Sequence, residues 1–166
     1  AGVMRLRVNP ADGQLYGTGL SGWQGPAGGK DGCFQRLRYT GETCRLLDSV
    51  TVVPKGIELH FNFDVDPAST TFANNWHAEM WDYLWSKKYG SDQFSVLHPG
   101  QKGHDIVSIA DALLKDSQTI RLVIPDIHPC DQLLLEVETR DRTGEPFLEK
   151  AYLTIHGIPE ESDIGN

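Results

Sequence analysis

The chain has 166 residues, of which 39% are hydrophobic and 23% are charged, as is typical of a globular protein with a buried core. Its formal net charge is −8 at pH 7. An acidic chain without clusters of Lys and Arg lacks the basic surface that binds nucleic acid or anionic membranes, so we expect neither as a partner. No apolar run approaches the roughly 18 residues of a membrane span, and no signal peptide is expected.

The N-terminal region contains three short segments in which apolar and polar residues alternate, as they do in half-buried strands. These segments are residues 3–8, 14–20 and 33–39. The turn "NPADG" at 9–13 separates the first two, and a glycine-rich loop around Trp23 separates the second from the third. We therefore predict a small antiparallel meander, resembling a propeller blade, in residues 1–45.

From residue 46 onward, strand-like segments recur about every ten to twelve residues with turn signals between them. Such spacing is typical of a β-sandwich. The predicted fold class is therefore all-β: an Ig-like β-sandwich over residues 46–158, with the N-terminal meander docked on it. A single helical turn is expected near Pro67, and residues 159–166 are expected to form a flexible tail.

An aromatic stretch at residues 74–90 holds three of the four tryptophans. Because aromatic residues suit a pleated surface and anchor sandwich cores, we interpret it as a strand inside the domain, with Trp81 and Tyr83 largely buried. In such a strand Trp81, Tyr83 and Trp85 share one face. The alternative is a set of exposed rings that binds carbohydrate, formed by Trp23, Trp76, Trp81, Tyr83, Trp85 and Tyr89.

Two groups of side chains have the residue types of a metal site. His98, His104 and Asp105 lie in "HPGQKGHD", where glycines let the loop fold back, so that the three side chains form a possible metal site. The alternative is a structured loop with capping polar residues. His77 and Glu79, two residues apart, share one face of a strand and need a third ligand to bind copper or zinc. We expect no cofactor.

Motifs of several well-known functional classes are absent from the sequence. Cys33, Cys44 and Cys130 include no CxxC pair, which excludes a zinc ribbon and a CxxCH haem attachment. Cys33 and Cys44 either meet across neighbouring strands as a disulfide or remain thiols. The chain has neither the G-x-S-x-G turn of a serine hydrolase nor the phosphate-binding G-x-x-x-x-G-K-[ST] loop.

Much of the chain resembles a known family. The segments "NPADGQLYGTGLSGWQ" and "DGCFQRLRYTG" resemble the closing blade of a β-propeller of the glucose/sorbosone dehydrogenase type. The rest is similar to the region after the propeller in large secreted proteins of planctomycetes and verrucomicrobia, which often also carry c-type cytochrome domains. The similar segments are "GIELHFNFDVDPAS", "WDYLWSKKYGS", "HPGQKGHD", "RLVIPDIHP" and "YLTIHGI".

The resemblance implies a secreted or periplasmic, non-catalytic accessory domain that scaffolds neighbouring domains of a sugar-dehydrogenase-like protein. The propeller with its cofactor pocket is missing from this chain, and so is the haem motif. Two alternatives stay open: a carbohydrate-binding module that uses the aromatics of residues 76–89, with polysaccharide as its partner, and a metal-dependent enzyme with a site near His98–Asp105. Buried tryptophans favour scaffolding, exposed rings favour sugar binding, and convergent histidine nitrogens favour the enzyme.

Overall fold

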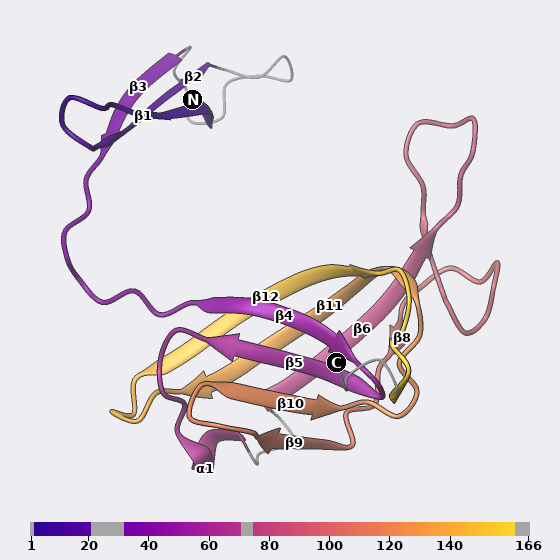
Figure 1. Cartoon of the computed structure of the whole chain (residues 1–166). Helices are drawn as coiled ribbons and strands as arrows, with labels where there is room; N and C mark the ends of the chain where they lie inside the picture. The colour runs from indigo at the N-terminus through magenta and orange to yellow at the C-terminus, as the bar shows by residue number, and fades with distance from the viewer. Residues whose placement is uncertain (1, 21–31, 71–74, 162–166) are drawn as a thin grey trace. The chain divides into compact units, whose positions relative to one another are not determined.

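The structure is a computed structural model that describes residues 2–20, 32–70 and 75–161 (Figure 1). The chain divides into two compact units, residues 1–44 and residues 45–166, and each unit is described by itself. Both are built almost entirely of antiparallel strands, which confirms the all-β prediction. No helix in the described ranges is long and apolar enough to cross a membrane.

The first unit is the predicted meander. Its strands pair in the order β1-β2-β3, with bounds Gly2–Val8, Leu15–Leu20 and Gly32–Leu37. The turn after β1 closes with a hydrogen bond from the Gly13 amide to the Asn9 carbonyl, and Gly13 adopts a φ of 66° that favours glycine. Among the described residues of this unit only Gly17 is buried. A sheet with so small an interior lacks a core of its own, and its docking on the sandwich stays a prediction.

The second unit contains two sheets that face each other (Figure 1). The first sheet has the order β4-β5-β10-β9, with bounds Leu47–Val53, Gly56–Phe61, Thr119–Val123 and Asp111–Leu114. The second has the order β12-β11-β6-β7, with bounds Pro146–Ile155, Cys130–Arg140, Trp76–Tyr83 and Gln93–Phe94. The short strand β8, Asp105–Ile106, also pairs with β6. The predicted helical turn is α1, Pro67–Thr70.

The hairpin between β4 and β5 is fixed by local backbone geometry. Lys55 adopts a φ of 55°, the left-handed conformation of a tight turn. A Cβ added to Gly56 would lie 2.1 Å from the carbonyl oxygen of Leu122 on β10. Only glycine therefore allows β5 to begin this close to β10, and the position of the hairpin in the sheet follows from that contact.

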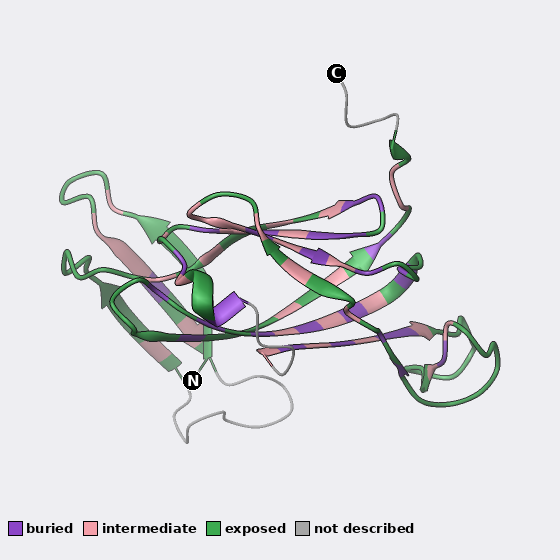
Figure 2. Cartoon of the chain, turned by 90° about the horizontal axis from the view of Figure 1, so that it is seen from below, coloured by how far each residue is buried: buried purple, intermediate pink, exposed green. Residues whose placement is uncertain are grey.

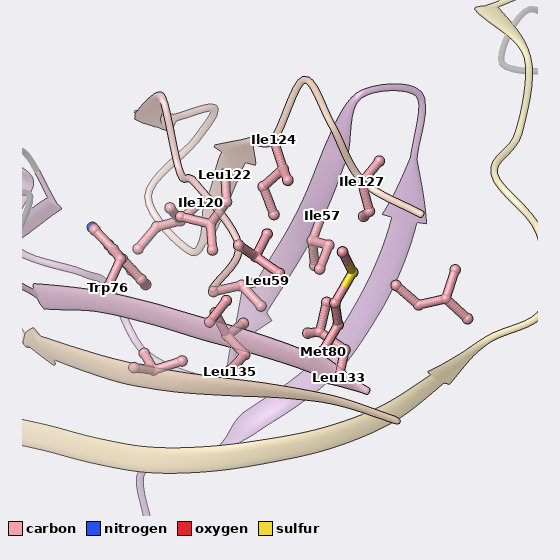
Figure 3. Packing of buried hydrophobic residues seen from close by; sticks show 14 of the residues in the cluster. Ile57, Leu59, Trp76, Met80, Ile120, Leu122, Ile124, Ile127, Leu133 and Leu135 are labelled. Carbon is pink, nitrogen blue, oxygen red and sulfur yellow. The ribbon is translucent and has the colours of Figure 1, made fainter. Parts of the chain in front are cut away.

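The core lies between the two sheets and is formed by alternate residues of four central strands (Figure 3). The first sheet contributes Ile57, Leu59 and Phe61 from β5, and Ile120 and Leu122 from β10. The second contributes Trp76, Ala78 and Met80 from β6, and Leu133, Leu135 and Val137 from β11. Because burial of each large apolar side chain stabilises the fold by about 1.5–3 kcal/mol, this layer holds the two sheets together.

The three cysteines differ in their surroundings. Cys33 is half-buried on β3, and Cys44 is exposed at the end of the first unit. Cys130 is buried at the start of β11, where burial raises the pKa of its thiol to about 11. A thiol with so high a pKa remains protonated at neutral pH, so Cys130 is a poor nucleophile.

Two leucines of the second sheet test the position of the core. Leu135 on β11 is 0% exposed and Leu148 on β12 is 68% exposed. We expect Leu135→Ala to lower the free energy of unfolding by about 2–5 kcal/mol, because it removes contacts between the sheets. The control, Leu148→Ala, should change it by no more than about 0.5 kcal/mol. Urea denaturation followed by tryptophan fluorescence measures both, and equal losses would contradict the assigned core.

Candidate functional site

Strand β6 has two faces with different neighbours. Trp76, Ala78 and Met80 point into the core between the sheets. His77, Glu79 and Trp81 lie on the opposite, outer face, since successive side chains of a strand alternate. Trp81 is nevertheless buried, with 4% of its surface exposed.

The imidazole of His104 covers Trp81. The two rings are stacked, with centroids 4.0 Å apart and an interplanar angle of 12°. The prediction that Trp81 is buried is therefore confirmed, but a loop residue buries it on the outer face of the sheet. Its indole Nε1 is buried without a hydrogen-bond partner in the described part of the chain.

A hydrogen-bond network surrounds this stack. Glu79 Oε1 lies 2.8 Å from His77 Nε2, and Glu79 Oε2 lies 2.6 Å from His104 Nδ1. The other ring nitrogen of His104, Nε2, lies 2.7 Å from Oε1 of Gln93 on β7. An ionised carboxylate only accepts hydrogen bonds, so both imidazoles donate to Glu79. We call these four residues the Glu79 network; it joins β6, β7 and the segment before β8.

The network also determines the charge of Glu79. Hydrogen bonds from His104 and then from His77 hold the pKa of the Glu79 carboxyl below its ordinary value of 4.5. The carboxylate is therefore ionised at neutral pH and already accepts two hydrogen bonds from the fold. It is engaged in positioning His104 rather than available as a general base.

Asp105 organises the loop between β7 and β8. Its Oδ1 accepts a hydrogen bond from Ser95 Oγ at 2.6 Å, and its Oδ2 accepts backbone hydrogen bonds from Val96 and Leu97 at 2.7 and 3.0 Å. Burial alone would raise the pKa of Asp105, but these hydrogen bonds leave it below the ordinary 3.8. Because the Ser95 hydroxyl donates directly to a carboxylate, it lacks the histidine base of a catalytic serine, although His98 Nδ1 lies 3.3 Å away.

The predicted metal group of His98, His104 and Asp105 does not come together. His104 and Asp105 are neighbours at the start of β8 and point to opposite sides, so His104 contacts Glu79 while Asp105 contacts the Ser95 loop. His98 Nδ1 lies 3.7 Å from Asp105 Oδ1. Across residues 2–20, 32–70 and 75–161, no three His, Cys, Asp or Glu side chains are placed to hold a metal ion.

The predicted carbohydrate residues have different environments. Trp76 belongs to the core, where its Nε1 donates to the Thr70 carbonyl at 3.0 Å, and Trp81 lies under His104. Neither ring can stack on a sugar in this structure. Trp23 lies outside the described residues.

The prediction that Tyr83 is largely buried is wrong, because 42% of its surface is exposed. Strand β6 ends at Tyr83, whose amide donates to Asp131 Oδ2 at 2.8 Å. The predicted face of Trp81, Tyr83 and Trp85 therefore does not form, since Trp85 lies beyond the strand. Trp85 and Tyr89 are fully exposed, at 103% and 101%.

Residues 84–92 between β6 and β7, which we call the aromatic loop, project away from the two sheets (Figure 1), and every residue in the loop is exposed (Figure 2). Its base is held by the pairing of β6 with β7 and by a 2.9 Å hydrogen bond from the Leu84 amide to Ser91 Oγ. A shallow hollow of about 300 Å³ lies against the loop. Its lining includes Ser86, Lys88, Tyr89, Ser91 and Asp92.

The aromatic loop can therefore offer two kinds of contact to a ligand. The rings of Trp85 and Tyr89 present apolar faces. The oxygens of Ser86, Ser91 and Asp92 already have partners within the chain, but they keep lone pairs that can accept hydrogen bonds from a ligand. This combination matches a sugar, whose ring has apolar C–H faces and a polar edge of hydroxyl groups.

Sequence reasoning missed two parts of this region. It found His77 and Glu79 on one strand face but not His104 as their partner, because contact over 25 residues leaves no local pattern. It also gave no role to Lys87 and Lys88 in the aromatic loop. A signal for these was present, since "WSKKY" places two cations between two aromatic residues.

No protein-family model, no curated protein and no solved structure matches the chain.

A matched pair of variants measures how much the buried Trp81 contributes to the free energy of unfolding. We expect Trp81→Ala to lower the free energy of unfolding by about 3–5 kcal/mol, because it leaves a cavity under His104. Trp85→Ala, the same substitution four residues on at a fully exposed position, should change it by about 0.5 kcal/mol or less. Guanidinium denaturation measures both, and a stable Trp81→Ala protein would refute this burial.

The Glu79 network predicts a pH-dependent contribution to stability. Because the pKa of Glu79 is lower in the folded than in the unfolded chain, its contribution is present above pH 4.5 and is lost as pH falls through the folded value. Glu79→Gln should lower the free energy of unfolding by about 1–2 kcal/mol at pH 7. The difference between the two proteins should shrink in urea titrations taken progressively below pH 4.5. A difference that stayed constant over this range would argue against the assigned hydrogen bonds.

Proposed function

We propose that the second unit is a non-catalytic accessory domain, with the strand arrangement of an Ig-like sandwich, that binds carbohydrate through the aromatic loop. The observation that carries this proposal is the full exposure of Trp85 and Tyr89 on one loop. Large apolar rings exposed together usually mark a binding surface. The sequence resemblance supports placing this domain in a secreted or periplasmic sugar-dehydrogenase-like protein, beside its neighbouring domains.

The Ig-like assignment is supported by the strand order. If the strands are lettered as in Ig domains, β4-β5-β10-β9 correspond to A-B-E-D and β12-β11-β6-β7 to G-F-C-C′. The buried Trp76 lies on β6, the counterpart of the strand that carries the core tryptophan of Ig domains. The aromatic loop is then the C–C′ loop at one end of the sandwich, and loops held by a rigid scaffold often carry binding residues.

The non-catalytic assignment is supported by the way polar groups are engaged. Glu79 accepts hydrogen bonds from two imidazoles, and Asp105 accepts hydrogen bonds from Ser95 and two backbone amides. Carboxylates that accept several hydrogen bonds from the protein hold its loops in place. This role accounts for both groups without a catalytic one.

Scaffolding of a neighbouring domain is the second candidate function, and one observation favours it. Strand pairing places Tyr152, Leu134, Glu79 and Ile106 in one row across the outer face of the second sheet. Tyr152 is 60% exposed and Ile106 is 67% exposed. A domain packed on this face would bury both side chains, independently of the aromatic loop.

A binding experiment on two double variants separates these functions. The whole chain is run by affinity electrophoresis through gels that contain neutral or acidic polysaccharides. We expect retention by at least one polysaccharide, and a loss of about tenfold or more in affinity for Trp85→Ala with Tyr89→Ala, because two stacking faces are removed. The control, Leu148→Ala with Tyr152→Ala on the outer face, should be retained like the native chain. Equal retention of the aromatic-loop variant would reject the proposal.

A further inference from the structure

The aromatic loop carries two adjacent lysines, Lys87 and Lys88, between Trp85 and Tyr89, and all four side chains are exposed. Residues 84–92 hold one carboxylate, Asp92, against these two lysines, so the loop has a local charge of +1 in a chain whose net charge is −8.

The two ammonium groups have no direct carboxylate partner in the part of the chain that the structure describes. The lysines that form ion pairs there are Lys55, Lys102, Lys115 and Lys150. The carboxylate of the loop, Asp92, is paired with Lys102 at 2.6 Å, and this contact is the main cause of its lowered pKa. Lys88 adds only a small electrostatic effect on Asp92.

Acidic groups also lie at the base of the loop, where the fold engages them. Asp82 Oδ1 accepts a hydrogen bond from the Asp131 amide at 2.9 Å, and Asp131 Oδ2 accepts one from the Tyr83 amide. These carboxylates fasten the end of β6 to the start of β11. The tip of the loop therefore presents two unpaired cations beside two aromatic faces.

We propose that the aromatic loop binds acidic polysaccharide, whose sugars carry carboxylate or sulfate groups, a proposal that rests on the carbohydrate binding proposed above. Trp85 and Tyr89 stack on sugar rings, while Lys87 and Lys88 pair with the acid groups along the chain. An unpaired ammonium group gains an ion partner only in the complex, so the acidic groups add affinity that a neutral polysaccharide cannot supply.

An anionic membrane is the other surface to which aromatic and basic side chains could bind, and the structure favours polysaccharide over it. The net charge of −8 opposes the approach of the chain to either anion, so charge alone does not decide between them. The hollow beside the rings is lined by Ser86, Ser91 and Asp92. These groups would lose hydration in a bilayer, whereas their oxygens can accept hydrogen bonds from sugar hydroxyls.

Matched probes and variants test this selectivity in the whole chain. The probes are dextran and dextran sulfate, which differ only in sulfate, and polygalacturonate and its methyl ester, which differ only in free carboxylate. The variant is Lys87→Gln with Lys88→Gln, and the control is Lys55→Gln with Lys115→Gln, which changes the net charge equally at other exposed sites. Calorimetric titration at low and high salt gives the affinities.

We expect the native chain to bind an acidic probe more tightly than its neutral counterpart. The loop-lysine variant should lose roughly 3- to 10-fold in affinity for that probe at low salt, while the control keeps its affinity. The difference should diminish at high salt, which screens exposed charges. The pair of acidic probes shows whether sulfate or carboxylate is preferred.

Four results would overturn the inference. If dextran and dextran sulfate bind equally, or the loop-lysine variant binds like the control, acid selectivity is wrong, while carbohydrate binding stands as long as it still needs Trp85 and Tyr89. If no polysaccharide binds, both proposals fail. Binding to phosphatidylserine vesicles without binding to any polysaccharide would replace the acidic polysaccharide with a membrane surface.

Discussion

The hydrogen bonds between Glu79 and two histidines are the interaction on which the arrangement of this region depends. Through His104 the carboxylate holds the segment before β8 against the outer face of β6, and through Gln93 the same imidazole contacts β7. These contacts bury Trp81 and fix the two strands from which the aromatic loop departs. Because charge-assisted hydrogen bonds are stronger than neutral ones, one ionised group can order several short elements.

Three tryptophans of one short stretch have different environments for geometric reasons. Trp76 faces the core because it lies on the inner face of β6. Trp81 lies on the outer face, where His104 stacks on it. Trp85 lies beyond the end of β6 and has no such cover. Residue type alone therefore does not separate a buried ring from an exposed one. The strand end at Tyr83 and the contacts of a distant loop do.

The fold was largely predictable because its signals are local. Alternating residues and turn chemistry predicted the meander, and the helical turn near Pro67 was also predicted. The β-sandwich also followed from the regular spacing of strands. By contrast, the end of β6 depends on Asp131 meeting Tyr83, a contact over 48 residues. No short sequence window contains that information.

The candidate site was predicted only in part, for related reasons. His77 and Glu79 were placed on one strand face because a period of two fixes it. The metal group of His98, His104 and Asp105 was wrong, because proximity in sequence does not make neighbouring side chains on a strand converge. Exposed rings were predicted only as the alternative. Of the five that the structure describes, Tyr83, Trp85 and Tyr89 are exposed.

The central claim is that stacking by His104 separates a structural Trp81 from the proposed binding surface at Trp85 and Tyr89. Hydroxyl-radical labelling of the whole chain, read by mass spectrometry with and without dextran sulfate, tests it most directly. The account predicts rapid labelling of Trp85 and Tyr89, slow labelling of Trp76 and Trp81, and protection of Trp85 and Tyr89 alone when the polysaccharide is added. Labelling of Trp81 as rapid as that of Trp85, or no protection at the aromatic loop, would contradict it.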